Sequence, residues 1–165
     1  MTERKKLHVS LLGKVDYPQA LHLQGQHLAL RQQNKIPDTL LLLEHPPVLT
    51  MGRRAKGEHI LAPTAFLASQ GITVHEINRG GDVTYHGPGQ IVGYPIINLN
   101  GYGRDIHAFI QMLEEVFIQL LDREYGITAR RESQTFTGVW VGGAKITAIG
   151  IAVKQAAVTA VVIPT

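Results

Sequence analysis

Residues 79–90 concentrate the residue types that can bind and polarise a ligand. The run reads Arg-Gly-Gly-Asp-Val-Thr-Tyr-His-Gly-Pro-Gly-Gln, with four glycines, one proline, one arginine and one histidine. A simple turn needs only one or two glycines or prolines, so this run indicates a backbone that lies close to a ligand. The guanidinium of Arg79 can approach an anionic or carbonyl group while Gly80 and Gly81 donate backbone hydrogen bonds. The alternative is a glycine-rich bulge in which Arg79 forms a salt bridge.

Two histidines and one lysine are further candidates for acid–base chemistry. His86 lies in the glycine-rich run and His45 follows an apolar run, so both can face one pocket as an acid, a base or a hydrogen-bond partner. The alternative for each is a purely structural histidine. Lys145 precedes the apolar run 146–153, where partial desolvation would lower its pKa and let it accept a proton. The alternative for Lys145 is an edge-strand lysine that opposes aggregation.

Several familiar kinds of site do not fit the sequence. The 165 residues contain no cysteine, which excludes disulfides, thiolate ligands and thiolate nucleophiles within them. The eight histidines show neither His-x-x-x-His nor His-Glu-x-x-His spacing, and no serine lies in a Gly-x-Ser-x-Gly motif. The glycine-rich run is followed by an apolar, strand-like run rather than by a helix, unlike a dinucleotide-binding loop. We therefore expect no metal and no cofactor.

Charge and hydropathy narrow the possible partners. A net charge of +3 is a mild bias, whereas nucleic-acid binding usually needs a denser basic face with aromatic platforms. No apolar run reaches the length of a membrane span, and the amino terminus lacks the features of a signal peptide. We expect a cytoplasmic protein that binds neither nucleic acid nor membrane.

The elements that must position these residues are strands alternating with a few helices. This pattern predicts a single domain over residues 1–165, of the α/β or α+β class, with a mixed sheet and flanking helices. Residues 155–165 carry no charge and predict either a strand or an exposed apolar end. The other predicted strands cover residues 7–12, 39–44, 72–77 and 91–97, with a hairpin of 138–141 and 145–153 across Gly142-Gly143. The predicted helices cover 17–33, 63–69 and 105–126, the last capped by Asp105 and ending near Gly126.

Three segments together resemble the octanoyltransferase family, whose members are also called lipoyl(octanoyl) transferases and share the lipoyl and biotin protein ligase-like fold. The first is the run 79–90, and the second is Glu-His-Pro-Pro-Val-Leu-Thr-Met-Gly-Arg at 44–53. The third is Thr-Gly-Val-Trp-Val at 137–141 followed by Gly-Ala-Lys-Ile-Thr-Ala-Ile-Gly at 143–150. The resemblance runs from about Val9 to Lys154.

The resemblance implies transfer of an octanoyl group from octanoyl-acyl carrier protein to a lysine of a lipoyl domain. The acceptors are the lipoyl domains of 2-oxo-acid dehydrogenases and the glycine cleavage H protein, the enzyme is a monomer, and no cofactor takes part. It also implies that Lys145 lowers the pKa of a nucleophilic cysteine and that His45 lies at the rim of the acyl pocket. The residues implied to line that pocket are Arg79, Gly80, Gly81, Asp82, Val83, Thr84, Tyr85 and His86, with Ala148, Ile149 and Gly150 on another side.

The chain departs from the family pattern after Lys154. The family continues through a Trp-x-Thr-x-His-Gly segment to a Pro-Cys-Gly motif that bears the nucleophile, and residues 155–165 match neither. We therefore expect a family member that is truncated or frameshifted near Lys154, with a retained acyl pocket and with transfer lost or impaired. One alternative is a noncatalytic module that binds an acyl chain or acyl carrier protein. Another is a lipoate ligase, which the ending His-Gly-Pro-Gly-Gln disfavours because ligases read His-Asp-x-Gly-Asn there.

Overall fold

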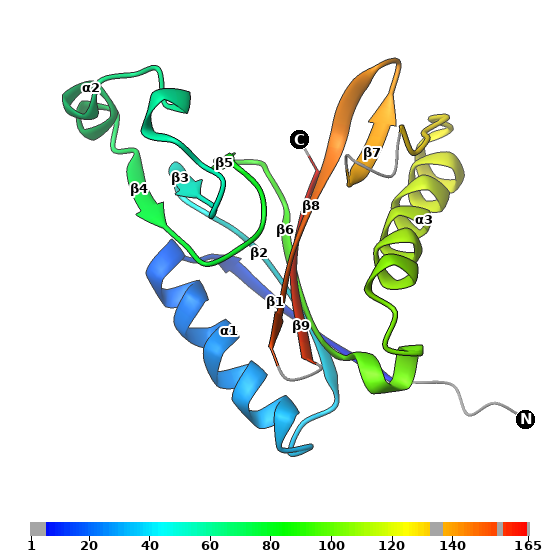
Figure 1. The fold of residues 1–165 in the computed structure, drawn as a ribbon. Helices are drawn as coiled ribbons and strands as arrows, with labels where there is room; N and C mark the ends of the chain where they lie inside the picture. Colours follow the sequence, from blue (N-terminus) through cyan, green and yellow to red (C-terminus); the bar gives the residue numbers. More distant parts are fainter. Residues whose placement is uncertain (1–5, 133–136, 155–156, 165) are drawn as a thin grey trace, which may run out of the picture.

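The strands of the protein form two mixed sheets (Figure 1). The computed structural model describes residues 6–132, 137–154 and 157–164. The large sheet has the order β1-β2-β6-β9-β8-β7 and the small sheet the order β4-β3-β5. Only β1–β2 and β3–β4 are parallel among the paired strands that the structure describes. The strands of the large sheet are β1 (Leu7–Lys14), β2 (Asp38–Glu44), β6 (Val92–Asn98), β9 (Ala157–Pro164), β8 (Ala144–Lys154) and β7 (Gly138–Val141), and those of the small sheet are β4 (Thr73–Glu76), β3 (Val48–Met51) and β5 (Val83–His86).

The predicted class is confirmed, but the expected single mixed sheet is divided in two. The division follows β2, where Pro46 and Pro47 lack the N–H groups that a strand ladder needs. The chain therefore leaves the large sheet and begins β3 in the small one.

Within the described residues, three α-helices flank the sheets: α1 (Tyr17–Gln32), α2 (Thr64–Ser69) and α3 (Ile106–Tyr125). Two short 3₁₀ helices, η1 (Gly57–His59) and η2 (Leu99–Tyr102), complete the helical elements of the described residues. The predicted cap of α3 is present, because Asp105 Oδ1 accepts a hydrogen bond of 3.0 Å from the backbone N–H of Ala108. The helix ends at Gly126, whose φ of 63° is typical of a glycine C-cap. Among the described helices, none is long and apolar enough to span a membrane.

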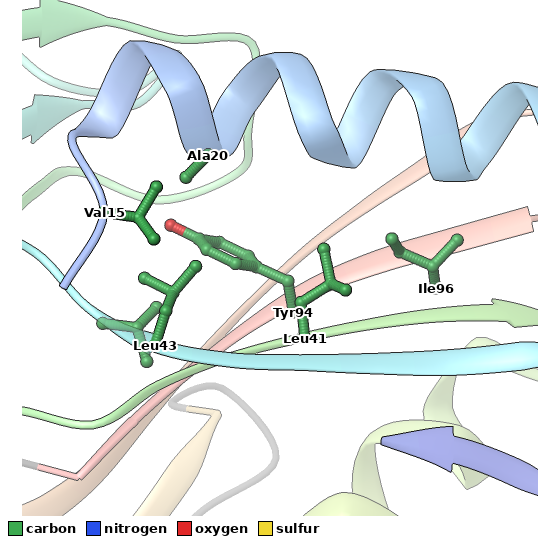
Figure 2. Close-up of a cluster of buried hydrophobic side chains, with 7 residues drawn as sticks. Val15, Ala20, Leu41, Leu43, Tyr94 and Ile96 are labelled. Carbon is green, nitrogen blue, oxygen red and sulfur yellow. The ribbon is translucent and has the colours of Figure 1, made fainter. Parts of the chain in front are cut away.

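Helix α1 covers one face of the large sheet, where it closes the main core (Figure 2). Ala20 of α1 is fully buried against Leu41 of β2 and against Tyr94 and Ile96 of β6. Alternate residues of a strand point to opposite faces, so Tyr94 and Ile96 face α1 while Ile97 faces away from it. Ile97 packs instead with Phe109 of α3, which places α3 on the opposite face.

The last strand lies inside the large sheet rather than at its edge. β9 pairs antiparallel with β6 on one side and with β8 on the other, for example Ile96 with Thr159 and Gly150 with Val161. Of the two predictions for residues 155–165, the strand is confirmed over Ala157–Pro164, while residues 155, 156 and 165 lie outside the described residues. Because β9 has a neighbour on each side, it fixes β8, the strand that carries Lys145, to the rest of the sheet.

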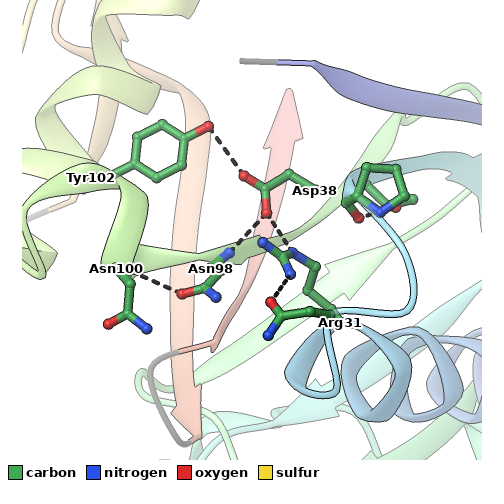
Figure 3. A network of polar contacts seen from close by, with 8 residues as sticks. Arg31, Asp38, Asn98, Asn100 and Tyr102 are labelled. Carbon is green, nitrogen blue, oxygen red and sulfur yellow. Dashed lines mark hydrogen bonds and ion pairs between the residues drawn. The ribbon is translucent and has the colours of Figure 1, made fainter. Parts of the chain in front are cut away.

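A polar network ties the end of α1 to the large sheet (Figure 3). Asp38, at the start of β2, accepts hydrogen bonds from Arg31 Nε at 2.7 Å, from the backbone N–H of Asn98 at 3.0 Å and from the Tyr102 hydroxyl at 3.3 Å. The Arg31 and Asp38 side chains are only 15% and 10% exposed. One buried carboxylate therefore joins α1, β2, the end of β6 and η2.

We predict that Asp38→Ala lowers the free energy of unfolding by about 3 kcal/mol, because it leaves the half-buried Arg31 charge without its carboxylate. Urea denaturation at neutral pH measures the loss. The control is Glu58→Ala, which breaks the exposed pair of Lys56 and Glu58 at 3.8 Å and costs less than about 1 kcal/mol. Equal losses in the two variants would contradict a structural role for the network.

Candidate acyl-binding site

The glycine-rich run forms a tight turn followed by strand β5. β5 pairs antiparallel with β3, placing Thr84 opposite Thr50 and Val83 opposite Met51. The sequence did not reveal β3 and β5 as strands, because each has four residues and their pairing joins distant segments. The turn that carries Arg79, Gly80 and Gly81 is thereby attached to a small sheet of its own.

The guanidinium of Arg79 holds this turn in place. Its Nη2 donates to the Thr50 carbonyl at 3.2 Å, to Thr50 Oγ1 at 3.0 Å and to Thr84 Oγ1 at 2.6 Å, while Nη1 donates to the Gly80 carbonyl at 2.9 Å. Arg79 is 9% exposed, and burial lowers the pKa of its guanidinium. The sequence left a ligand contact and a salt bridge open for Arg79; the hydrogen bonds of this guanidinium go to neutral oxygen atoms of the protein itself.

Two glycines allow the close packing around Arg79. A Cβ atom at Gly52 would lie 2.5 Å from the Gly81 carbonyl oxygen, which real side chains do not tolerate. Gly81 has a φ of 95°, and a Cβ there would lie 2.8 Å from Arg79 Nη1. Backbone hydrogen bonds from Arg53 to the Arg79 carbonyl and from Arg54 to the Gly81 carbonyl complete the contact between the two loops.

Lys145, the second residue of β8, projects its ammonium group toward β7. Nζ donates to the Thr137 carbonyl at 3.1 Å and lies 4.6 Å from the centre of the Trp140 ring. Burial lowers the pKa of Lys145, while the carboxylates of Glu114 and Glu132 raise it. Both the carbonyl and the ring therefore restrict where the amine can lie.

Glu114, which the sequence did not identify, supports the site from outside the pocket lining. It belongs to α3 and is 5% exposed, and its Oε1 accepts a hydrogen bond of 2.9 Å from the backbone N–H of Gly138. Its Oε2 accepts from Arg131 Nε at 3.1 Å. The detectable signal was a carboxylate on the apolar stripe of α3, one position after Leu113. Glu114 fixes the start of β7, directly next to the Thr137 carbonyl that holds Lys145.

The glycine-rich turn and strand β8 line one pocket of about 1030 Å³. The sequence predicted that residues 79–86 and 148–150 share a site. The structure brings residues of both segments together in this pocket, and Lys145 lines it as well. The predicted residues in the lining are Arg79, Gly80, Gly81, Asp82, Val83, Thr84, Tyr85, Lys145, Ala148, Ile149 and Gly150; those that the sequence analysis did not name as site residues are Arg54, Gln90, Ile110, Thr137 and Ile151.

The structure places His45 and His86 in the interior, outside the lining of this pocket. His45 is 0% exposed; its Nδ1–H donates to the Val15 carbonyl at 2.7 Å, so its Nε2 accepts from the Tyr94 hydroxyl at 2.8 Å. The expected position of His45 at the rim is therefore corrected, because β2 ends beneath α1 and turns this side chain against the Tyr17 ring, 5.3 Å away between centres.

His86 is 2% exposed, and its ring lies 5.4 Å from that of His45. Burial is the larger cause, and the neighbouring His45 the next, of a pKa of His86 lowered to about 4. Burial also lowers the pKa of His45 and raises that of Tyr94. Both histidines are therefore neutral near pH 7 and pack in the interior, where His45 is hydrogen-bonded through both ring nitrogens.

Comparison with known proteins identifies the class of protein to which this chain belongs. The family model of the lipoyl protein ligase A/B catalytic domain matches residues 16–162, eight residues past the point where the sequence resemblance was expected to end. The crystal structure of a lipoate-protein ligase A bound with ATP superposes with a TM-score of 0.76 at 17% identity, covering 95% of this chain and 65% of that one. A bipartite lipoate protein ligase from Thermoplasma acidophilum gives a TM-score of 0.72 at 18% identity, covering 98% and 62%. At these identities the structures establish the fold.

Relatives of higher identity place the chain within that class. It is 59% identical over 150 residues to an octanoyltransferase of Caldicellulosiruptor saccharolyticus, covering 91% of this chain and 64% of the relative. It is 52% identical over 149 residues to an octanoyltransferase of Alkaliphilus metalliredigens, covering 90% and 68%. The chain belongs to the octanoyltransferase family, and it spans about two thirds of the length of these curated relatives.

We predict that stability falls as the pH is lowered from about 6.5 to about 4. The unfolded histidines have a pKa near 6.5, so within this window the unfolded chain binds more protons than the folded one, and stability is complete only above it. The pKa of His86, about 4, corresponds to a loss of up to about 3 kcal/mol. Urea denaturation across this range measures the effect. His86→Gln should flatten the pH dependence, whereas the exposed His107→Gln should preserve it; a flat profile in the unmodified chain would refute the prediction.

We predict that Glu114→Ala lowers the free energy of unfolding by about 2 kcal/mol, because it removes the acceptor of the buried Gly138 N–H. The matched control is Glu115→Ala, since Glu115 also accepts a hydrogen bond from Arg131 but is 45% exposed. This control should cost less than about 1 kcal/mol. Chemical denaturation compares the two, and a larger loss for Glu115→Ala would show that the Arg131 contact, not the Gly138 bond, matters.

Proposed function

We propose that the chain provides the acyl-thioester pocket of an octanoyltransferase of protein lipoylation. The substrate would be octanoyl-acyl carrier protein, and the acceptor a lysine on the lipoyl domain of a 2-oxo-acid dehydrogenase or on the glycine cleavage H protein. The reaction would take place in the cytoplasm. The observation that carries this proposal is the shared pocket of the 79–85 turn and strand β8.

The composition of the pocket suits a medium-length acyl thioester. Ile110, Ile149 and Ile151 offer apolar surface to an aliphatic chain, and each buried methylene is worth about 0.8 kcal/mol. Arg54 and Lys145 supply cationic groups that can attract the anionic arm of a carrier-linked thioester. We assign Arg79 the role of shaping the pocket, because its hydrogen bonds fix the backbone of the turn.

Lys145 is the group that would stabilise a thiolate in the completed reaction. An ammonium beside a thiol lowers the pKa of the thiol, and the thiolate is the form that attacks a thioester. The 165 residues contain no cysteine, so the thiolate of a two-step transfer would come from outside them. A noncatalytic module that binds acyl carrier protein is the second candidate, and this composition is the observation in its favour.

We predict that the chain binds octanoyl-acyl carrier protein saturably and that Ala148→Trp weakens binding by about tenfold or more, because the indole fills the pocket. Isothermal titration calorimetry measures both affinities. The control is Ala68→Trp, which places the same side chain on the exposed surface of α2 and should bind like the unmodified chain. A folded sample without saturable binding would refute the proposed function.

Adding an apo-lipoyl domain to the same samples tests whether the 165 residues can transfer the acyl group by themselves. Mass spectrometry of the lipoyl domain should show octanoylation no faster than the uncatalysed reaction if the 165 residues only bind the substrate. Octanoylation at an enzymatic rate would exclude the noncatalytic module and would require a nucleophile other than cysteine.

A further inference from the structure

Ile110 lines the pocket from α3, a helix outside all three segments that carry the family resemblance. We propose that Ile110 determines the acyl chain length that the pocket accepts, because it limits the apolar end of the pocket together with Ile151 of β8. The inference rests on the proposed function, since it requires the acyl chain of a thioester to bind in this pocket. It goes further by naming the end that receives the terminal methyl group and the side chain that limits it.

The lining of the pocket has a charged part and an apolar part. Arg54 and Asp82 are charged and exposed, whereas Ile110 and Ile151 are apolar and half-buried. Burying methylene groups away from water is favourable, and burying a charged phosphate without partners is not. A carrier-linked thioester therefore places its phosphate-bearing arm near the exposed charges and its aliphatic chain against the isoleucines.

The apolar part ends at the core between the large sheet and α3. Ile151 lines the pocket and also packs against the cluster of Ile97, Leu99 and Phe109. Phe109 is 2% exposed and immediately precedes Ile110 in α3. Because close-packed side chains lie behind this end, an acyl chain that reaches Ile151 extends further only by displacing the core.

The glycine-rich turn lies against β8 at the same place. A Cβ atom at Gly80 would lie 3.8 Å from the Ile151 carbonyl oxygen, and one at Gly150 would lie 3.6 Å from Arg79 Cδ. The turn and the strand therefore approach to ordinary van der Waals distance. Arg79 is fixed by its hydrogen bonds and Ile151 belongs to the core, so the adjustable side chain at this end is Ile110.

Glu114 holds the part of α3 that carries Ile110. The two residues are four positions apart and share one side of the helix. Glu114 accepts a hydrogen bond from the Gly138 N–H, and Gly138 pairs with Ala148, a lining residue of β8. Among the described residues of α3, Ile110 alone lines the pocket, whereas Ile118, four positions beyond Glu114 and also half-buried, does not.

The test titrates nonreactive thioether analogues of butanoyl-, octanoyl- and dodecanoyl-coenzyme A into the chain by isothermal titration calorimetry. The unmodified chain should bind the octanoyl analogue most tightly. Ile110→Ala should raise the ratio of dodecanoyl to octanoyl affinity by about tenfold, because it makes room for additional buried methylenes. Ile110→Phe should shift the preference toward the butanoyl analogue. Ile118→Ala, the same truncation outside the lining, should keep the ratios of the unmodified chain.

The outcomes distinguish this inference from the proposed function. Circular dichroism establishes that each variant is folded, and Ile110→Val, which should give a smaller shift in the same direction, replaces Ile110→Ala if the latter unfolds. Unchanged affinity ratios in the folded Ile110 variants, or equal affinity of the unmodified chain for all three analogues, would overturn the inference and leave the proposed function standing. An equal shift in Ile118→Ala would also overturn it. If the unmodified chain bound no analogue, the proposed function itself would fail.

Discussion

The pocket depends on the hydrogen bonds of one buried guanidinium. Arg79 donates to oxygen atoms of Thr50, Gly80 and Thr84, and so joins β3, the glycine-rich turn and β5. These acceptors are neutral, so the burial of the charge is offset by oriented dipoles rather than by a carboxylate. A planar group with several N–H donors fits this arrangement, whereas a lysine offers a single point of attachment. The glycines at 52 and 81 follow from the same contact, because a side chain at either would displace the guanidinium or the backbone beside it.

The opposite side of the pocket is organised by a buried carboxylate. Glu114 binds the Gly138 N–H at the start of β7, and the neighbouring Thr137 carbonyl binds Lys145. Each side therefore uses one buried charged group, Arg79 or Glu114, to hold the backbone next to the pocket. Both charged groups are largely buried. Arg79 donates to neutral oxygen atoms, whereas Glu114 accepts from the Gly138 N–H and from Arg131.

The sequence predicted those parts of the structure that have local signals. The cap of α3 at Asp105, its end at Gly126 and the turn at Gly142-Gly143 each reflect a residue preference that acts within a few positions. The motif resemblance also predicted that residues 79–86 and 148–150 would share a site; residues 79–85 and 148–150 line one pocket, whereas His86 does not. β3 and β5 were not predicted, because four-residue strands with distant partners leave little periodicity. The burial of His45 was not predicted for a related reason. It depends on α1, which comes from another part of the chain and packs over the end of β2.

The separation between interior and pocket clarifies which groups can take part in chemistry. His45, His86 and Tyr94 form a neutral, hydrogen-bonded or packed group beneath the sheet surface, with the pKa values of both histidines lowered by burial. Proton transfer to bound substrate requires contact, and the pocket lining contains neither histidine. Lys145 does lie in that lining, and burial lowers its pKa. Of Lys145 and the two histidines, only Lys145 therefore lies where it can contact a ligand bound in this pocket.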